Sequence, residues 1–468
     1  MTKLKHRRTL LFVLAFSLAV AGFVFFALYR AKQTQGHRRI LPFAAARPVL
    51  EALPNEVPPP LKEPKESKWY AWAQQEDNAV RARLEQGALD SMINLLLFGT
   101  SFTTQPRVIT MRDFEDPVVQ VRVADLVEAL REPKNNERLI FLQNILRRRG
   151  IHPETSGGFE GTKTFVMENL RRVVQEQNTI REKFEEAGGE SNQEAGLSKR
   201  SRVFRNRGIS VDTTILSSFG IEGALRDMRD RAVLPKGPIT RVAVIGPGLD
   251  FTDKGFGYDF YPLQTLQPFA IYDSVVRLGL GEPGKIEITA FDISREVLDH
   301  LRRARERAEK GENYVVQLPR ESWPWAPEAV DYWRSFGSEI GTPVPPIQPP
   351  PALNDLETRA VAIRPEVVLS CKPVDLNVVF EQVVGPSVKP FDLIIATNVF
   401  LYYDTFEQAL ALQNISSLLK PGGFFLTNNW LAQVSETPMR STGYTLVQYG
   451  ESSDWGDNVF WWQRNDTR

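Results

Sequence analysis

A glycine turn and a carboxylate in this chain have the spacing of a nucleotide site. Gly246-Pro247-Gly248 follow the apolar run 242–245, and Asp292 ends a second apolar run, 286–291. Because glycine has no Cβ, such a turn lets the backbone approach a ligand closely. A carboxylate at the tip of the next strand is placed to accept hydrogen bonds from ribose hydroxyls. Together the two features predict a nucleoside pocket at the carboxyl edge of a sheet.

Two other interpretations stay open for this stretch. Gly-Pro-Gly after a strand is often a tight turn, and Asp292 or Ser294 could be the N-cap of the helix that follows. A dinucleotide fingerprint is disfavoured, because Gly248 is followed by Leu249-Asp250-Phe251 and a long insertion. That fingerprint needs a third glycine and a helix that begins directly.

The second half of the chain adds a pattern of alternating strands and helices. Residues 391–397 (FDLIIAT) are apolar on both faces and end at Asn398, which predicts a central parallel strand. A helix over 405–419 stops at Lys420-Pro421-Gly422-Gly423, and a strand over 424–427 follows. Further strands are predicted at 313–318, 367–370, 444–449 and 458–463.

These residues resemble the second half of a class I S-adenosylmethionine-dependent methyltransferase. The resemblance lies in FDLIIATNVFLYYD and ALALQNISSLLKPGGFFLTNN, with VIGPG, AFD and VDL upstream in that order. It covers roughly residues 234–464 and implies an α/β fold with a Rossmann-like seven-stranded mixed sheet. The implied cofactor is S-adenosyl-L-methionine, with an unknown methyl acceptor.

The resemblance assigns roles to the residues of the opening motif. Gly246, Pro247 and Gly248 would pass beneath the methionine and ribose portion of the cofactor. Asp292, with Ile293 beside it, would accept hydrogen bonds from both ribose hydroxyls.

Residues after the third and fourth strands receive the remaining roles. Asp375 would accept from the adenine amino group, with Leu376 packing on the ring, and Asn398 would face the sulfonium. Methyl transfer from a sulfonium is an in-line displacement, for which alignment can supply much of the catalysis. A base is needed only if the acceptor must first lose a proton. Asn398, Tyr402 and Tyr403 are placed to line the acceptor side, although either tyrosine could instead be a core residue.

Two positions depart from the family pattern. Val244 stands where the family usually has an acidic residue, and Asp250 stands where it usually has a small one. The first change removes a carboxylate that would help to hold the ammonium of the cofactor. Asp250, Asp253 or Asp259 could replace it. A non-catalytic scaffold with a degenerate pocket therefore remains an alternative.

Four regions are predicted along the chain. Residues 1–30 contain an uncharged run at 10–29, long enough to span the roughly 30 Å apolar core of a bilayer. The proline-rich residues 31–68 predict an extended spacer, and residues 69–232 a helical domain. Residues 233–468 form the methyltransferase-like domain, with insertions at 251–268 and 319–365. The prediction is a single-pass membrane protein that contacts the lipid bilayer through 10–29. Its catalytic domain is expected on the cytoplasmic side if the enzyme is active, because the basic residues on the two sides of the run do not decide the orientation.

Composition narrows the class of partner. The 468 residues include 57 Lys plus Arg and 57 Asp plus Glu, so no overall charge indicates nucleic acid. No residue pattern predicts a metal site, and the single cysteine, Cys371, cannot form an intrachain disulfide. Helical periodicity in the helical domain predicts helices at 80–98, 121–130, 137–146 and 165–184.

Overall fold

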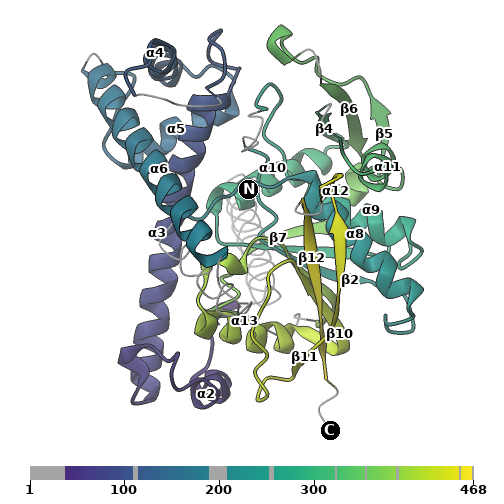
Figure 1. Ribbon diagram of the computed structural model, residues 1–468. Helices are drawn as coiled ribbons and strands as arrows, with labels where there is room; N and C mark the ends of the chain where they lie inside the picture. Colours follow the sequence, from purple (N-terminus) through teal and green to yellow (C-terminus); the bar gives the residue numbers. More distant parts are fainter. Residues whose placement is uncertain are drawn as a thin grey trace, which may run out of the picture.

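The computed structural model describes residues 37–108, 114–155, 157–188, 208–251, 258–321, 324–353, 356–385, 389–452 and 455–465. A seven-stranded sheet lies at its centre, and a group of helices stands beside it (Figure 1). The sheet has the strand order β11-β12-β10-β9-β2-β3-β7. Its strands are β2 (Arg241–Ile245), β3 (Glu287–Asp292), β7 (Cys371–Asp375), β9 (Phe391–Ala396), β10 (Leu419–Thr427), β11 (Met439–Gln448) and β12 (Gly456–Arg464).

The direction of the strands makes this a mixed sheet. β7, β3, β2, β9 and β10 run parallel to one another, and β12 runs antiparallel to both β10 and β11. The chain leaves β2 toward β3 on one side and later returns to β9 on the other side. The predicted seven-stranded mixed sheet is confirmed, and it is consistent with a methyltransferase fold.

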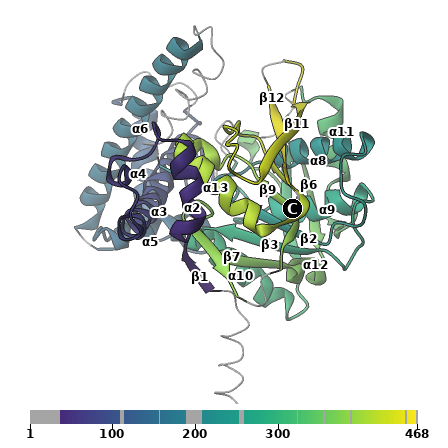
Figure 2. The ribbon, with the colours of Figure 1, turned by 90° about the horizontal axis from the view of Figure 1, so that it is seen from below.

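Helices cover both faces of the sheet, which is why its central strands are apolar throughout. Val242 and Val244 pack into the core on one face, whereas Ala243 and Ile245 pack into the core on the other. The first face is covered by α8 (Ile215–Asp230), α9 (Gln267–Arg277) and α10 (Arg295–Ala308). The second is covered by α13 (Thr405–Leu418), α2 (Phe43–Ala52) and the first half of α3 (Glu66–Phe98). Figure 2 shows α2 and α13 side by side.

The second half of α3 joins a separate helical group. It packs with α4 (Pro117–Arg131), α5 (Glu137–Arg148) and α6 (Gly158–Gly188) around a third core. Asp116 and Asn136 cap α4 and α5 by accepting hydrogen bonds from the first backbone amides. The four helices predicted in this region from periodicity are confirmed.

The predicted spacer at 31–68 is wrong for residues 37–68. β1 (His37–Ile40) pairs antiparallel with β8 (Glu381–Val384), and α2 follows it. Val49 and Leu50 of α2 are buried in the core under α13, and a 3-10 turn, η1 (Pro59–Leu61), buries Leu61. The apolar residues between the prolines therefore cover the sheet rather than extend away from it.

The predicted boundary between a helical domain and the sheet domain at residue 232 also needs correction. α8 precedes that boundary, yet it packs on the sheet through Phe219 and Ile221. The first half of α3 also packs on the sheet, through Trp69 and Trp72, before the helix continues into the helical group. Amphipathic periodicity shows that a helix has an apolar face, but it does not show what covers that face.

Residues 319–365, predicted to be an insertion, largely form regular elements. β4 (Tyr314–Arg320), β5 (Gly341–Val344) and β6 (Glu357–Ile363) form a small antiparallel sheet in the order β4-β6-β5. Between them lie α11 (Pro327–Ser335) and a 3-10 turn, η2 (Pro351–Leu353). The predicted strand at 367–370 is instead helix α12 (Pro365–Ser370), and β7 begins only at Cys371. Pro365 fixes φ at a value suited to the first turn of a helix.

The predicted membrane anchor at 10–29 lies outside the described residues. Within the parts of the chain that the structure describes, no helix is both long enough and apolar enough to cross a membrane.

Candidate functional site

A cavity of about 950 Å³ opens at the carboxyl ends of the parallel strands. It lies between the neighbouring strands β2 and β9. The strand that follows β2 in the main sheet, β3, adds on one side of this pair, and the strand that follows β9, β10, adds on the other. In open α/β sheets, ligands bind at such a switch point. Gly246 and Gly248 after β2, Asp292 at the end of β3 and Asn398 after β9 all line this cavity. The structure therefore brings together the main predicted site residues.

The two glycines of the turn have positive φ angles, which residues with a Cβ adopt only with strain. Gly246 and Gly248 have φ values of 65° and 67°. A Cβ on Gly248 would lie 2.6 Å from the carbonyl oxygen of Val211. The amide of Leu249 donates to that same oxygen at 2.7 Å, and Thr213 donates its amide to the Leu249 carbonyl at 3.2 Å. Residues 211–213 thus run directly beside the turn, which the sequence analysis missed.

Asp292 is a buried carboxyl group of this wall, with 7% of its surface exposed. Burial raises its pKa to about 7, and the backbone amides of Ser294, Gly248 and Ile293 partly oppose that shift. The Ser294 amide donates to the carboxylate at 2.7 Å. The hydroxyl of Ser294 caps α10 by accepting from Val297. The helix cap and the site residue are therefore two different side chains.

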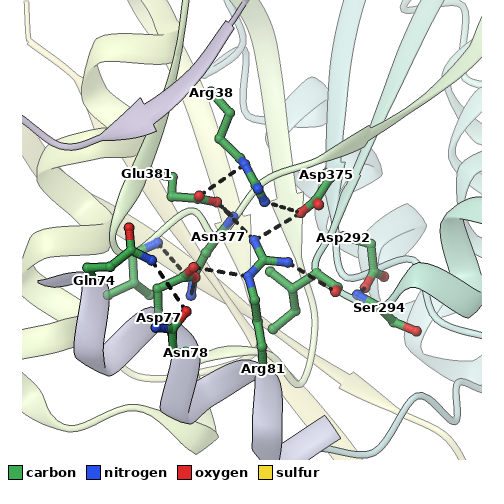
Figure 3. Close-up of polar contacts among 12 residues, drawn as sticks. Arg38, Gln74, Asp77, Asn78, Arg81, Asp292, Ser294, Asp375, Asn377 and Glu381 are labelled. Atoms are coloured by element: carbon green, nitrogen blue, oxygen red, sulfur yellow. Dashed lines mark hydrogen bonds and ion pairs between the residues drawn. The ribbon is translucent and has the colours of Figure 1, made fainter. Parts of the chain in front are cut away.

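Asp375 is the cross-strand partner of Asp292, at the end of β7. Its carboxylate ion-pairs with Arg38 at 2.8 Å and with Arg81 at 2.9 Å (Figure 3). Asp375 does not line the cavity, and neither does Pro247. These ion pairs hold the Asp375 carboxylate beside the site, and its contact with adenine stays a prediction.

Arg81 of α3 ties the helical layer to the sheet edge. It contacts Asp77 at 3.0 Å and Glu381 at 3.1 Å, and it donates to the Ile293 carbonyl at 3.4 Å. Burial lowers the pKa of Arg81, but Asp77, Asp375 and Glu381 raise it further, so the net shift is upward. The Asn377 amide group donates to Asp77 at 2.8 Å. This network fixes the chain that follows β7 (Figure 3).

The residues after β7 form the next part of the wall. Leu376 is buried and lines the cavity with Ile293, as the sequence analysis predicted for both. Asn377 lines it too, although no pattern in the sequence indicated this residue. Its position depends on Asp77, 300 residues away in the chain.

Asp250 is the only one of the three proposed replacement carboxylates that the structure places in the cavity wall, although Asp253 lies outside the described residues. Its Oδ2 accepts from the Tyr261 hydroxyl at 2.9 Å and from the Gln264 side chain at 2.8 Å. Asp259 instead accepts from the amides and hydroxyls of Thr100 and Ser101.

Val244 faces away from this site. Its side chain is fully buried in the core on the α8 side of the sheet. An acidic residue in place of Val244 would bury its charge in an apolar core, which is energetically unfavourable.

Asn398 and Tyr402 both line the cavity, as predicted. Asn398 has a φ of 58°, a conformation that asparagine adopts more readily than most residues. Its amide and side chain exchange hydrogen bonds with Asn428 at 2.8 and 2.9 Å. The Tyr402 hydroxyl accepts from the Ser210 amide at 3.2 Å. Tyr402 is therefore held by the segment that also approaches the glycine turn.

The opposite wall contains residues that the sequence analysis did not predict. α3 supplies Asp90, Ser91 and Asn94, and α6 supplies Val173 and Gln177. Nothing in the helical periodicity of these segments marks them as site residues, because Ser91, Asn94 and Val173 are buried like the core positions beside them.

The end of the chain supplies a third part of the wall, with Tyr449, Trp455 and Asp457. Asp457 lies near the start of β12. Because β12 is antiparallel to β10, its first residues lie at the edge where β10 ends. That rule could have identified Asp457 from the sequence, once the direction of the last strand was known.

No protein-family model and no curated protein sequence matches the chain. Several solved methyltransferase structures do. The N-methyltransferase NodS from Bradyrhizobium japonicum WM9, in complex with S-adenosyl-L-homocysteine, is 12% identical with a TM-score of 0.26, covering 54% of this chain and 100% of NodS. Magnesium protoporphyrin IX methyltransferase (ChlM) from Synechocystis PCC 6803, with bound SAM, is 8% identical with a TM-score of 0.26. The match covers 61% of this chain and 90% of ChlM. The glycopeptide N-methyltransferase MtfA is 11% identical with a TM-score of 0.26, covering 54% and 98%.

Proposed function

We propose that this chain is an S-adenosylmethionine-dependent methyltransferase. The proposal depends on one observation: the glycine turn and Asp292 both lie at the edge of the sheet where the strand order reverses. The glycine turn after β2 and the carboxyl group of Asp292 at the tip of β3 lie on the same cavity wall. That arrangement fits a nucleoside whose ribose lies across the ends of the two strands.

The polar and apolar side chains of this wall fit the ribose and adenine of the cofactor. The Asp292 carboxyl group is buried, and its described contacts are with backbone amides. Two ribose hydroxyls would supply the further donors that stabilise its ionised form. Leu376 and Ile293, both on the wall, offer apolar surface to an adenine ring beside Asp292.

The ammonium of the cofactor would be held by Asp250. Its carboxylate lies two residues past Gly248 and is held by Tyr261 and Gln264. This position compensates for the apolar residue at Val244. Asp250→Asn should therefore weaken binding of S-adenosylmethionine while keeping both hydrogen bonds possible.

Catalysis by this site would depend mainly on alignment. The cofactor supplies a methyl group on a sulfonium, and Asn398 and Tyr402 would orient the acceptor toward it. Asn398 is suited to this role because its left-handed backbone and its two hydrogen bonds with Asn428 fix its position. Effective alignment of two reacting groups is worth about 7–11 kcal/mol of barrier.

Calorimetry of the full-length chain in detergent tests the proposal. S-adenosylhomocysteine should bind, and Asp292→Ala should raise its dissociation constant at least about tenfold, because each charge-assisted hydrogen bond is worth about 1.5–3 kcal/mol. Asp299→Ala is the matched control, since Asp299 lies on α10 outside the cavity. Equal affinity in Asp292→Ala and the parent contradicts the assigned role. No binding by the folded parent favours the non-catalytic scaffold.

The membrane tether is part of the same proposal. It is supported by the uncharged run at 10–29 and by its length. The sulfonium cofactor is made in the cytosol, so an active enzyme would keep its C-terminal part on the cytoplasmic side. Fractionation of cells should place the full chain with membranes and a chain lacking residues 1–36 in the soluble fraction. Recovery of both in the soluble fraction contradicts the tether.

A further inference from the structure

The wall of the cavity carries charge of one sign. Six acidic side chains line it, and no Lys, Arg or His does so in the described parts of the chain. The acidic residues are Asp90, Asp212, Asp250, Asp292, Glu321 and Asp457. A cleft lined by one sign of charge raises the local concentration of ligands of the other sign. An anionic acceptor would meet no cationic side chain among the described residues of this wall. Asp90 already ion-pairs with Arg172 at 2.7 Å. Asp250 and Asp292 are assigned to the cofactor, so a cationic acceptor would rely on Asp457.

Asp457 is the acidic group connected to the predicted methyl-transfer position. Asn428 donates to Asn398 at 2.9 Å and to Asp457 at 2.9 Å through the same side-chain nitrogen. The Tyr449 hydroxyl donates to Asp457 at 2.7 Å. A continuous set of polar side chains therefore runs from the end of β9 to the start of β12. It places Asp457 on the acceptor side of Asn398, away from Asp292 at the end of β3.

The carboxylate of Asp457 has one oxygen available to a ligand. Both hydrogen bonds reach Oδ2, and no described residue donates to Oδ1. Burial raises the pKa of Asp457, while its hydrogen bonds with Tyr449 and Asn428 lower it. A partly buried carboxylate without a cationic partner gains most from a ligand that brings a positive charge.

Aromatic side chains surround the same position. Tyr449 and Trp455 both line the cavity, with ring centroids 6.4 Å apart and ring planes at 87°. Trp325 lines it nearby, and its backbone bridges to Gly450. Aromatic faces beside a carboxylate form the kind of surface that binds organic cations through cation–π attraction.

We propose that the methyl acceptor is an amine that enters as an ammonium ion and is bound by Oδ1 of Asp457 beside Tyr449 and Trp455. The inference rests on the proposed methyltransferase function and adds the chemical class of the acceptor. It also assigns Asp457, Tyr449 and Trp455 to the acceptor-binding part of the cavity.

The transfer step balances with these groups. The ammonium gives one proton to the Asp457 carboxylate and becomes a neutral amine. The nitrogen lone pair attacks the methyl carbon, so an N–C bond forms while the S–C bond breaks. The electron pair of the broken bond stays on sulfur, which becomes a neutral thioether. The product is a methylated ammonium ion, and Asp457 releases its proton to solvent.

Three probes of nearly equal shape and different charge test the acceptor class. They are phenethylamine, 2-phenylethanol and 3-phenylpropanoate, which are cationic, neutral and anionic at pH 7. Their binding to the full-length chain, saturated with S-adenosylhomocysteine, is measured by saturation-transfer NMR and by calorimetry. Binding of S-adenosylhomocysteine is measured first, so failure of the proposed function is seen separately from failure of this inference.

The amine should bind at least about tenfold more tightly than the alcohol, and the carboxylate should bind most weakly. Asp457→Asn should remove that preference, while the dissociation constant for S-adenosylhomocysteine changes less than twofold. Asp299→Asn, which removes a charge from α10 outside the cavity, should leave the preference unchanged.

Three results overturn the inference when S-adenosylhomocysteine is bound. The first is equal binding of all three probes, or tighter binding of the carboxylate. The second is binding of none of them. The third is an amine preference that survives in a folded Asp457→Asn protein. If that variant does not fold, the charge order of the three probes on the parent protein still decides the question.

Discussion

The two walls of the cavity are built in different ways. On the sheet side, the lining residues follow strand ends within a few positions: Gly246 and Gly248 after β2, Asp292 at the end of β3 and Asn398 after β9. On the helical side, lining residues come from the second half of α3, from α6 and from the segment that precedes α8. Ser91 of α3 is fixed there by a 3.1 Å hydrogen bond to Asp212, 121 residues away.

This difference shows which parts of a site are local in sequence. Parallel strands present their carboxyl ends at one edge, so residues after those ends must meet. The helical wall has no such rule. Its composition depends on which helix face packs against the sheet, and long-range contacts such as Ser91 with Asp212 decide that. The four predictions below test the two walls and the contacts that join them.

The largest effect is expected from removing the N-terminal segment that covers the sheet. Deleting residues 1–53 removes β1, α2 and the buried side chains of Leu41, Val49 and Leu50. At about 1.5–3 kcal/mol for each buried side chain, the loss is on the order of 5 kcal/mol. Deleting residues 1–36 leaves every described contact in place and should not change the urea midpoint. Equal stability of the two truncated proteins would contradict the packing of residues 37–53 on the sheet.

The glycine turn should show the next largest effect. Gly248→Ala places a Cβ 2.6 Å from the Val211 carbonyl oxygen and also requires φ near 67°, so we expect a loss of about 3 kcal/mol. Gly284→Ala is the control, because Gly284 has φ of 76° with nothing within 4 Å of the added Cβ. It should lose only about 1 kcal/mol from backbone strain. Urea unfolding measures both, and equal losses would show that residues 211–213 do not press against the turn.

Arg81, which links α3 to the edge of the sheet, should contribute less to the free energy of unfolding. Arg81→Met leaves the buried carboxylates of Asp77 and Glu381 without that guanidinium. Because the Arg81 side chain is 24% exposed, we expect a loss of about 2 kcal/mol, below the range for fully buried pairs. Arg295→Met breaks a surface pair with Asp299 and should cost at most about 0.5 kcal/mol. Thermal and urea unfolding should rank the two variants in this order, and the reverse order contradicts the role given to Arg81.

Much of the sheet and one wall of the site could be predicted from the sequence, because both depend on short patterns. The apolar strands β2 and β9 and the turn at Gly246 are each specified within about ten residues. β7 was placed too early, because VVLS in α12 has the composition of a strand. The ion pairs of Asp375 could not be predicted, because its two arginine partners, Arg38 and Arg81, lie far from it in the chain.

The acceptor side was the least predictable part. Asp457 and Trp455 look like ordinary turn residues before a final strand, and only the antiparallel pairing of β12 brings them to the carboxyl edge. Of the small sheet β4-β6-β5, the sequence predicts only the first strand, at 313–318, for a related reason. Its strands are separated by prolines and tryptophans, and they pair with each other rather than with the main sheet.

The central claim is that Asp292 binds the ribose of a nucleoside cofactor, and its titration tests this claim directly. In the free protein the pKa of Asp292 is raised to about 7, above its unfolded value near 3.8. Its contribution to folding stability is therefore fully present below pH 3.8 and is lost as pH rises through 7. Ribose hydroxyls favour the ionised form, so binding of S-adenosylhomocysteine should release a proton below pH 7.

The measurement is calorimetry of S-adenosylhomocysteine binding to the full-length chain at pH 5.5 and pH 7.5. The account predicts about tenfold tighter binding at the higher pH, which corresponds to a pKa decrease of about 1.5 units on binding. Asp292→Asn should bind more weakly and show no such dependence. A parent protein whose affinity is the same at both pH values, or an Asp292→Asn protein that keeps the tenfold change, would contradict the claim.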